Sequence, residues 1–179
     1  AQIALRRLSL LSNVPAAQLR AGKVGDEDWA RMQAGMAKAI AGETWIYDRS
    51  AITLDELVSI ARKWKHRHGI GLLFIDYAQR IRVPGVDRIT EVATVARTLK
   101  DLARDLNIPV VSLAQVKASV DTRNDKRPNQ GDLANSDELT READQILMLY
   151  RDAAYYHDVL PNGNPVPRGI AEIIVEKNR

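Results

Sequence analysis

The stretch 69-GIGLLFIDYAQRIRVPG-85 decides the fold class, because a short apolar run in it ends in one acid, Asp76. The run 72-LLFID-76 is continuously apolar, and the polar segment 82-RVPGVDR-88 follows it. A continuously apolar run predicts a strand with both faces buried, as in a parallel sheet. The carboxylate at the end of such a strand then needs an explanation of its own.

The segments around this strand alternate between helical and extended patterns. Helical periodicity or helix signals occupy 1–12, 15–24, 27–42, 54–69, 89–107 and a short segment from Ser136 to about Ala143, whereas apolar extended runs occupy 44–48, 72–76, 109–115, 145–152 and 169–179. Strands that alternate with helices predict a doubly wound, mostly parallel α/β sheet flanked by helices. The last two strands, joined through 152–168, are equally compatible with a long antiparallel hairpin.

Helix boundaries are marked by capping residues. Asp26 is a suitable N-cap for 27–42, and Thr53 with Glu56 forms a capping box for 54–69. Gly22 and Gly69 each follow a helical segment and predict its end.

Composition limits the classes of protein that fit. The chain has 179 residues, 45% of them hydrophobic, which is enough for one domain with a sizeable core. The absence of cysteine excludes disulfides and thiolate metal sites. No segment approaches the ~20 apolar residues of a membrane span, so no membrane partner is expected. A net charge of +3 is compatible with nucleic acid but too mild to establish it.

Two predicted strands end in polar residues, the first in Asp76 and 109-PVVSLAQ-115 in Gln115. Ligands of open parallel sheets bind beyond the carboxyl ends of the strands. An acid after four apolar residues is the Walker B pattern, in which the carboxylate holds a magnesium ion that bridges nucleotide phosphates. The alternative is a strand-terminal turn residue, because apolar runs that end in aspartate are common.

Several motifs in one order resemble a known family. IDYAQ, SLAQ, LYRD and IAEIIVEKNR follow one another at 75–79, 112–115, 149–152 and 170–179, and together they are similar to the DnaB family of replicative helicases. The resemblance covers essentially the whole chain and implies a RecA-like motor domain. It also implies a homo-hexamer that uses ATP and Mg²⁺ to move 5′→3′ on single-stranded DNA in a bacterial or phage-infected cytoplasm, with primase and a helicase loader as possible partners.

The resemblance assigns roles to four residues. Asp76 matches the Walker B aspartate and is expected to ligate magnesium, and Gln115 matches the glutamine that senses the γ-phosphate and couples it to DNA. Lys177 and Arg179 match the basic pair that reaches the neighbouring subunit's nucleotide site. Two cations at i and i+2 of a strand point to the same side, which suits a joint reach. A solvated strand end is the alternative for this pair.

The resemblance also places a DNA-binding loop at 131-GDLANSDELTREAD-144. The family has an arginine and a glycine where this chain has Ala134 and Asp137. We expect Asn135 and Ser136 to lie at the DNA, with backbone amides after Ser136 available to a phosphate. Further candidates for phosphate contacts precede this segment at Arg123, Lys126 and Arg127, for which an ordinary solvated loop is the alternative.

One expected motif is absent from the 179 residues, because G-x-x-x-x-G-K-[ST] does not occur. By resemblance, the chain is expected to be one RecA-like domain truncated at both ends, with a helical part at 1–69 and a β/α core at 70–179. We expect it to hydrolyse little ATP by itself. The alternatives are another RecA-like ATPase, or a non-catalytic module that docks on a helicase ring.

Overall fold

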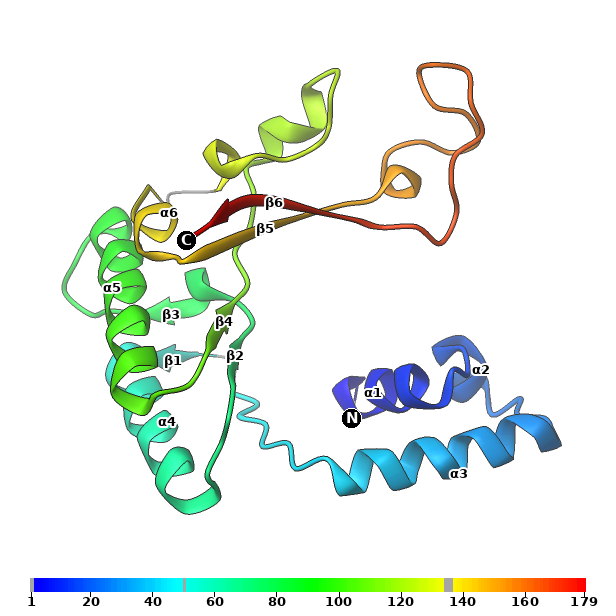
Figure 1. The fold of residues 1–179 in the computed structure, drawn as a ribbon, viewed down its shortest axis with the longest axis horizontal. Helices are drawn as coiled ribbons and strands as arrows, with labels where there is room; N and C mark the ends of the chain where they lie inside the picture. The colour runs from blue at the N-terminus through cyan, green and yellow to red at the C-terminus, as the bar shows by residue number, and fades with distance from the viewer. Residues whose placement is uncertain (1, 50, 134–136) are drawn as a thin grey trace. The chain divides into compact units, whose positions relative to one another are not determined.

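The structure is a computed structural model that describes residues 2–49, 51–133 and 137–179 (Figure 1). The chain divides into two compact units, a helical unit that ends at Asp48 and a larger α/β unit that begins at Arg49. The two units are described separately.

Residues 2–48 of the helical unit form three helices, α1 (Gln2–Ser12), α2 (Ala16–Ala21) and α3 (Asp26–Ala41). Gly22 ends α2 in the left-handed conformation with φ of 66°, as predicted. The predicted N-cap of α3 was wrong by one residue. Gly25 occupies the cap position, and Asp26 is the first helical residue. There its carboxylate still favours the positive end of the helix dipole.

Helices α1 and α3 approach closely at Gly35, the buried residue of α3. A Cβ atom at position 35 would lie 2.9 Å from both the Cβ and the backbone nitrogen of Ser12. The Ser12 side chain is buried and donates to the Leu8 carbonyl at 2.7 Å. The two backbones can therefore meet only because residue 35 lacks a side chain.

We expect Gly35→Ala to destabilise the helical unit, although alanine is the better helix former by about 1 kcal/mol. Overpacking against the Ser12 backbone costs about 1–3 kcal/mol and outweighs this gain. Gly71→Ala is the control, because a Cβ atom there meets nothing within 4 Å. Thermal unfolding followed by circular dichroism checks this, and a higher melting temperature for Gly35→Ala contradicts it.

The described residues of the α/β unit form three pairs of strands. Strand β1 (Ile52–Thr53) pairs in parallel with β3 (Ile81–Arg82), and β2 (Leu73–Ile75) pairs in parallel with β4 (Val110–Ser112). Strand β5 (Gln145–Tyr150) pairs with β6 (Glu172–Asn178) in an antiparallel hairpin, which is one of the two arrangements compatible with the sequence. Parallel pairs joined through helices agree with the predicted α/β class.

Two long helices cover one face of the β2–β4 pair (Figure 1). They are α4 (Leu54–His68), capped by the Thr53 side chain, and α5 (Arg88–Leu106), capped by Asp87. Leu73 and Ile75 point into the core that these helices share, whose other members include Leu57, Ala61, Val95, Leu99 and Leu102. This core fixes the direction in which β2 and β4 end.

The expectation that both faces of 72–76 are buried was wrong. Phe74 alternates with the buried residues of β2 and is 56% exposed. Opposite faces of a strand alternate residue by residue, and in the described chain only one face of β2 packs on helices. The strand predicted at 44–48 is also absent, because this segment pairs with no strand among the described residues.

Candidate active site

Asp76 and Gln115 follow neighbouring parallel strands, at the same edge of the α/β unit. The pairing of β2 with β4 continues beyond the strands, since the Leu113 amide donates to the Ile75 carbonyl at 2.9 Å and the Ala78 amide donates to the Leu113 carbonyl at 2.9 Å. These bonds enclose Asp76, whose side chain is exposed. Gln115 is also exposed, two residues beyond the last of them. The structure therefore brings the two predicted residues to one edge.

Gln79 is a site residue that the sequence did not single out. It lies in the 3₁₀ turn η1 (Ala78–Arg80) directly after Asp76, and its side-chain oxygen accepts the Gln115 amide at 3.4 Å. Its Nε2 atom is buried without a partner among the described residues. Only the oxygen of a side-chain amide can accept a hydrogen bond. The hydrogen bond from the Gln115 backbone amide therefore assigns the Gln79 oxygen to that side. The signal in the sequence was a polar residue three positions after the acid.

Glu91 of α5, which is 5% exposed, supports the turn that carries Gln79. Its carboxylate accepts the Val83 amide at 2.9 Å and pairs with Arg88 and Arg82. Arg88 in turn donates to the Gln79 carbonyl. Burial raises the pKa of Glu91, but the Val83 amide and the two arginines lower it more, so that its pKa lies below the usual value.

We expect Glu91→Gln to reduce the free energy of unfolding at pH 7 by about 1–3 kcal/mol, because two cations lose their buried partner. Since the folded pKa lies below the unfolded pKa, the stabilisation is present above the unfolded value of about 4.3 and is lost as pH falls through the folded pKa. The difference between wild type and variant should therefore shrink at acid pH. Urea unfolding at several pH values measures it.

Asp101→Asn is the control for this prediction, because Asp101 lies exposed on the same helix. A Glu91→Gln effect that stays constant down to the lowest accessible pH would contradict a role for the ionised carboxylate.

The segment 116–133, which we call the connecting loop, begins shortly after β4 and runs into the predicted DNA segment 131–144. Its two ends pair through a bridge between Val116 and Leu133. Its interior is organised by Asp132, which is 8% exposed and accepts both ends of the Arg123 guanidinium at 2.9 and 3.1 Å. Asp132 also accepts the Asn129 amide at 2.9 Å. Arg123, a predicted phosphate contact, is therefore paired inside the loop.

The other two predicted phosphate contacts of this loop also have partners in the chain. Arg127 donates to both oxygens of Glu172 on β6, at 2.6 and 2.9 Å, and its guanidinium lies 4.6 Å from the centroid of the Tyr150 ring. The Lys126 ammonium donates to the Asp121 carbonyl at 2.7 Å and to the Arg123 carbonyl at 3.1 Å. All three cations thus order the connecting loop in this structure.

Lys177 and Arg179 lie at the end of β6, and the Lys177 side chain has partners within the chain. The Lys177 ammonium donates to the Thr140 carbonyl at 2.7 Å and to the Arg141 carbonyl at 3.0 Å, at the end of helix α6 (Asp137–Glu142). Burial lowers the pKa of Lys177, and the charge of Arg179 lowers it further. The Arg179 side chain is exposed, while its amide donates to the Asp144 carbonyl at 3.0 Å.

The predicted DNA contacts Asn135 and Ser136, and the altered position Ala134, lie outside the described residues. Asp137, the other altered position, is the first residue of α6. Two ion pairs hold the second half of the predicted DNA segment against α5. One joins Arg97 to Glu138 at 2.8 Å, and the other joins Lys100 to Asp144.

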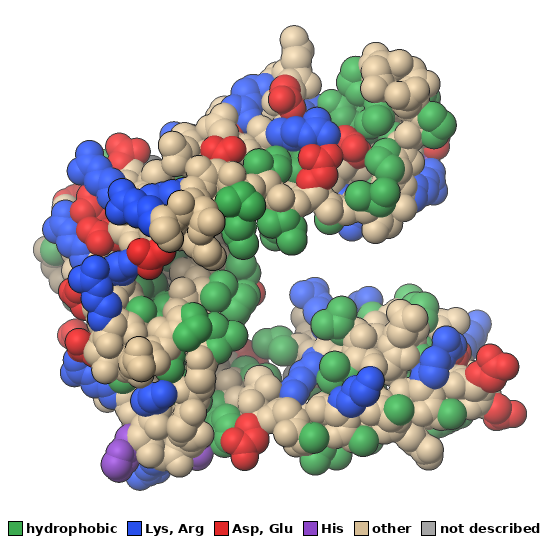
Figure 2. Space-filling model, viewed as in Figure 1, with side chains coloured by type: hydrophobic (Ala, Val, Ile, Leu, Met, Phe, Trp, Pro, Cys, Tyr) green, Lys and Arg blue, Asp and Glu red, His purple; other side chains and the backbone are tan. Residues whose placement is uncertain are grey.

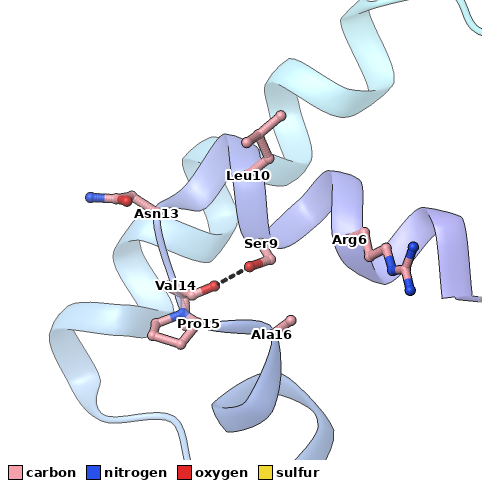
Figure 3. Close-up of a pocket in the computed structure, with 7 residues that line it drawn as sticks. All are labelled: Arg6, Ser9, Leu10, Asn13, Val14, Pro15 and Ala16. Atoms are coloured by element: carbon pink, nitrogen blue, oxygen red, sulfur yellow. Dashed lines mark hydrogen bonds between the residues drawn. The ribbon is translucent and has the colours of Figure 1, made fainter. Parts of the chain in front are cut away.

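A hollow of about 330 Å³ lies in the helical unit and contains none of the predicted site residues (Figure 3). It is lined by Arg6, Ser9, Leu10, Asn13, Val14, Pro15 and Ala16. Ser9 donates to the Val14 carbonyl at 2.6 Å across its floor. Within the described ranges, His, Asp and Glu side chains form no group of three that could hold a metal, and no described helix is long and apolar enough to span a membrane.

Comparison with known proteins gives consistent results. A replicative DNA helicase DnaB of Buchnera aphidicola (Schizaphis graminum) is 40% identical over 183 residues, and one of Geobacillus stearothermophilus is 36% identical over 181. Each comparison covers 99% of this chain, and the chain spans 38% of the length of these relatives. A solved DnaB-like replicative helicase, studied with its primase interactions, superposes over 98% of this chain and 42% of its own, with a TM-score of 0.86 and 27% identity.

A second solved structure, an ATPase domain, has a TM-score of 0.86 and 26% identity over 99% of this chain and 63% of its own. The fold is therefore that of RecA-like ATPase domains, which confirms the predicted fold class. The DnaB-like helicase C-terminal domain family matches residues 1–179. The chain belongs to this family.

Proposed function

We propose that the parent protein is an ATP-dependent replicative DNA helicase and that residues 1–179 form part of its motor domain. The observation that carries this proposal is the family match over the whole chain, together with Asp76 and Gln115 at one edge of the parallel strands. The relatives are bacterial replicative helicases, so we place the parent in the cytoplasm of a bacterial or phage-infected cell.

Magnesium and ATP are the proposed cofactors, and Asp76 suits the metal. Mg²⁺ keeps several waters and is usually held by one or two carboxylates together with substrate phosphates, so a single exposed acid at a strand end is an adequate protein ligand. The ion supplies charge stabilisation at the transferring phosphoryl group. The role of Asp76 is to hold the ion from a rigid strand, and the role of Gln115 is to donate from the neighbouring strand toward the γ-phosphate.

Exposed apolar side chains support the proposal that 1–179 is one part of a larger RecA-like domain. Figure 2 shows hydrophobic side chains gathered over β5 and β6 and beside β2 and β4. They are Leu72, Phe74, Val111, Leu113, Leu147, Leu149, Ile173 and Val175, each between 37% and 68% exposed. Exposed patches of this extent mark contact sites in native proteins. We assign this surface to the segment of the parent that carries the phosphate-binding loop.

The proposed partners are single-stranded DNA and further copies of the same chain in a hexameric ring, with 5′→3′ movement. The relatives' names and the solved helicase with its primase interactions support these partners, and a primase contact is part of the proposal. Arg179 is the proposed finger toward the neighbouring subunit, because its side chain is exposed at the end of β6. Lys177 is proposed to leave the end of α6 when it acts beside Arg179.

A second candidate function is a non-catalytic module that docks on a helicase ring. It is favoured by Ala134 and Asp137, since an acid at the start of α6 opposes a phosphate. Such a module would bind a helicase without turning over ATP.

The parent protein tests both functions. We expect it to hydrolyse ATP with Mg²⁺, to be stimulated by single-stranded DNA and to unwind a duplex that carries a 5′ single strand. Residues 1–179 alone are expected to hydrolyse little. A parent that neither hydrolyses ATP nor unwinds DNA, but binds a helicase ring, favours the module instead.

A further inference from the structure

The connecting loop is fastened more firmly than its exposed, polar sequence suggests. The bridge between Val116 and Leu133 closes its neck, and Asp132 organises its body. Two further contacts tie it to β6, one from Arg127 to Glu172 and one from the Gln130 amide to Glu176 at 3.1 Å. These contacts at its neck, body and outer edge make the loop one compact unit.

Arg127 makes the most directional of these contacts. Its guanidinium meets both oxygens of Glu172 and stacks on Tyr150, a geometry that lysine cannot reproduce. The hydrogen bonds from Arg127 lower the pKa of Glu172, and the same bonds raise the pKa of Arg127. An exposed ion pair alone contributes little, but two parallel bonds and an aromatic face fix one orientation.

These contacts leave Arg127 poorly suited to bind a phosphate. Both donors that face Glu172 are in use at 2.6 and 2.9 Å, and one face of the guanidinium lies on the Tyr150 ring. A DNA phosphate would have to compete with a carboxylate that is already paired in the folded chain.

We propose that Arg127 is a positioning residue that couples the nucleotide edge to the DNA segment by holding the connecting loop on β6. The proposal rests on the proposed function. Gln115 immediately precedes Val116 at the neck, and Leu133 across the neck lies in the predicted DNA segment, two residues before Asn135. A shift of Gln115 is therefore passed to Leu133 through the bridge.

The two contacts with β6 hold the connecting loop in place relative to that strand while Gln115 shifts. Glu172 and Glu176 lie on the strand whose end carries Lys177 and Arg179, so the loop and the proposed finger are parts of one connected body. Without Arg127 the loop keeps the bridge between Val116 and Leu133 but loses its bidentate contact with Glu172. A shift of Gln115 then deforms the loop instead of moving the DNA segment. The coupling is carried by contiguous contacts between elements, as a physical pathway requires.

The experiment is a charge exchange in the full-length parent. The variants are Arg127→Glu, Glu172→Arg and the double exchange, and the measurement is the ratio of ATP turnover with and without single-stranded DNA. We expect each single variant to lower this ratio about tenfold, which is within the usual range for coupling between sites. The double exchange, which restores an opposite pair, is expected to recover most of the loss.

Arg168→Glu and Asp158→Arg form the matched control. They reverse an exposed ion pair of 3.3 Å that touches neither the connecting loop nor β6. The control variants should leave the ratio unchanged. Arg127→Lys is the variant to use if Arg127→Glu does not fold, since it keeps the charge and loses the two-pronged geometry.

DNA affinity at several salt concentrations separates positioning from direct contact. If Arg127 positions the loop, the slope of log affinity against log salt concentration stays constant in Arg127→Glu while the stimulation ratio falls. If Arg127→Glu reduces that slope by about one and the double exchange does not recover it, Arg127 is a phosphate contact and the proposal is wrong. An unchanged ratio in all variants also overturns it, whereas a wild-type parent without DNA-stimulated turnover refutes the proposed function instead.

Discussion

Asp76→Asn lowers the Mg²⁺-dependent ATP turnover of the parent protein by at least about a hundredfold, the usual scale for removal of a group that stabilises transition-state charge. The amide is neutral and nearly isosteric, so it keeps the turn after β2 but loses the charge that holds the metal. The bonds on either side, from Leu113 to Ile75 and from Ala78 to Leu113, involve backbone atoms only. They are expected to survive the substitution, and the strand end should keep its geometry.

Asp101→Asn is the matched control, because it removes an exposed carboxylate from α5 far along the chain from the strand end. Thermal unfolding of both variants separates folding from chemistry. If Asp76→Asn lowers turnover and raises the Mg²⁺ concentration needed for half-maximal rate, the carboxylate holds the metal. If turnover of a folded Asp76→Asn protein equals that of wild type, Asp76 is only a turn residue.

The sequence predicted those elements whose apolar residues pack on one shared core. Helix α5 is the clearest case, because Val95, Leu99 and Leu102 recur at helical spacing and all three are buried. The strand at 44–48 was predicted from local pattern alone and was wrong. An extended segment becomes a strand only when a partner lies beside it, and the residues themselves do not reveal the partner.

The strand ends were predictable for the same reason that the core was. A rigid apolar run determines where its last residue lies, so the positions of Asp76 and Gln115 beyond two neighbouring strands could be predicted from the sequence. The internal ion pairs of Arg123 and Arg127 could not be predicted, because their partners Asp132 and Glu172 are 9 and 45 residues away. Charge in a polar loop indicates solvent, nucleic acid or an internal pair equally well, and only the folded chain distinguishes them.

Arg179→Ala is expected to lower ATP turnover of the parent ring by about a thousandfold or more, the usual contribution of an arginine finger. The proposed finger acts on the neighbouring subunit, so its loss disables a site in a different chain from the one that carries the substitution. The Arg179 side chain is exposed at the end of β6, whereas the Lys177 ammonium donates to the Thr140 carbonyl at the end of α6.

Mixed rings test this action between subunits. When Asp76→Asn and Arg179→Ala subunits are combined in equal amounts, about a quarter of head-to-tail interfaces carry an intact Asp76 from one subunit and an intact Arg179 from the next. Turnover should therefore reappear on mixing two inactive proteins. Arg168→Glu mixed with Asp76→Asn is the control for dilution, and it should scale only with the amount of active subunit. If mixing restores nothing although mixed rings form, Arg179 acts within its own subunit or not at all.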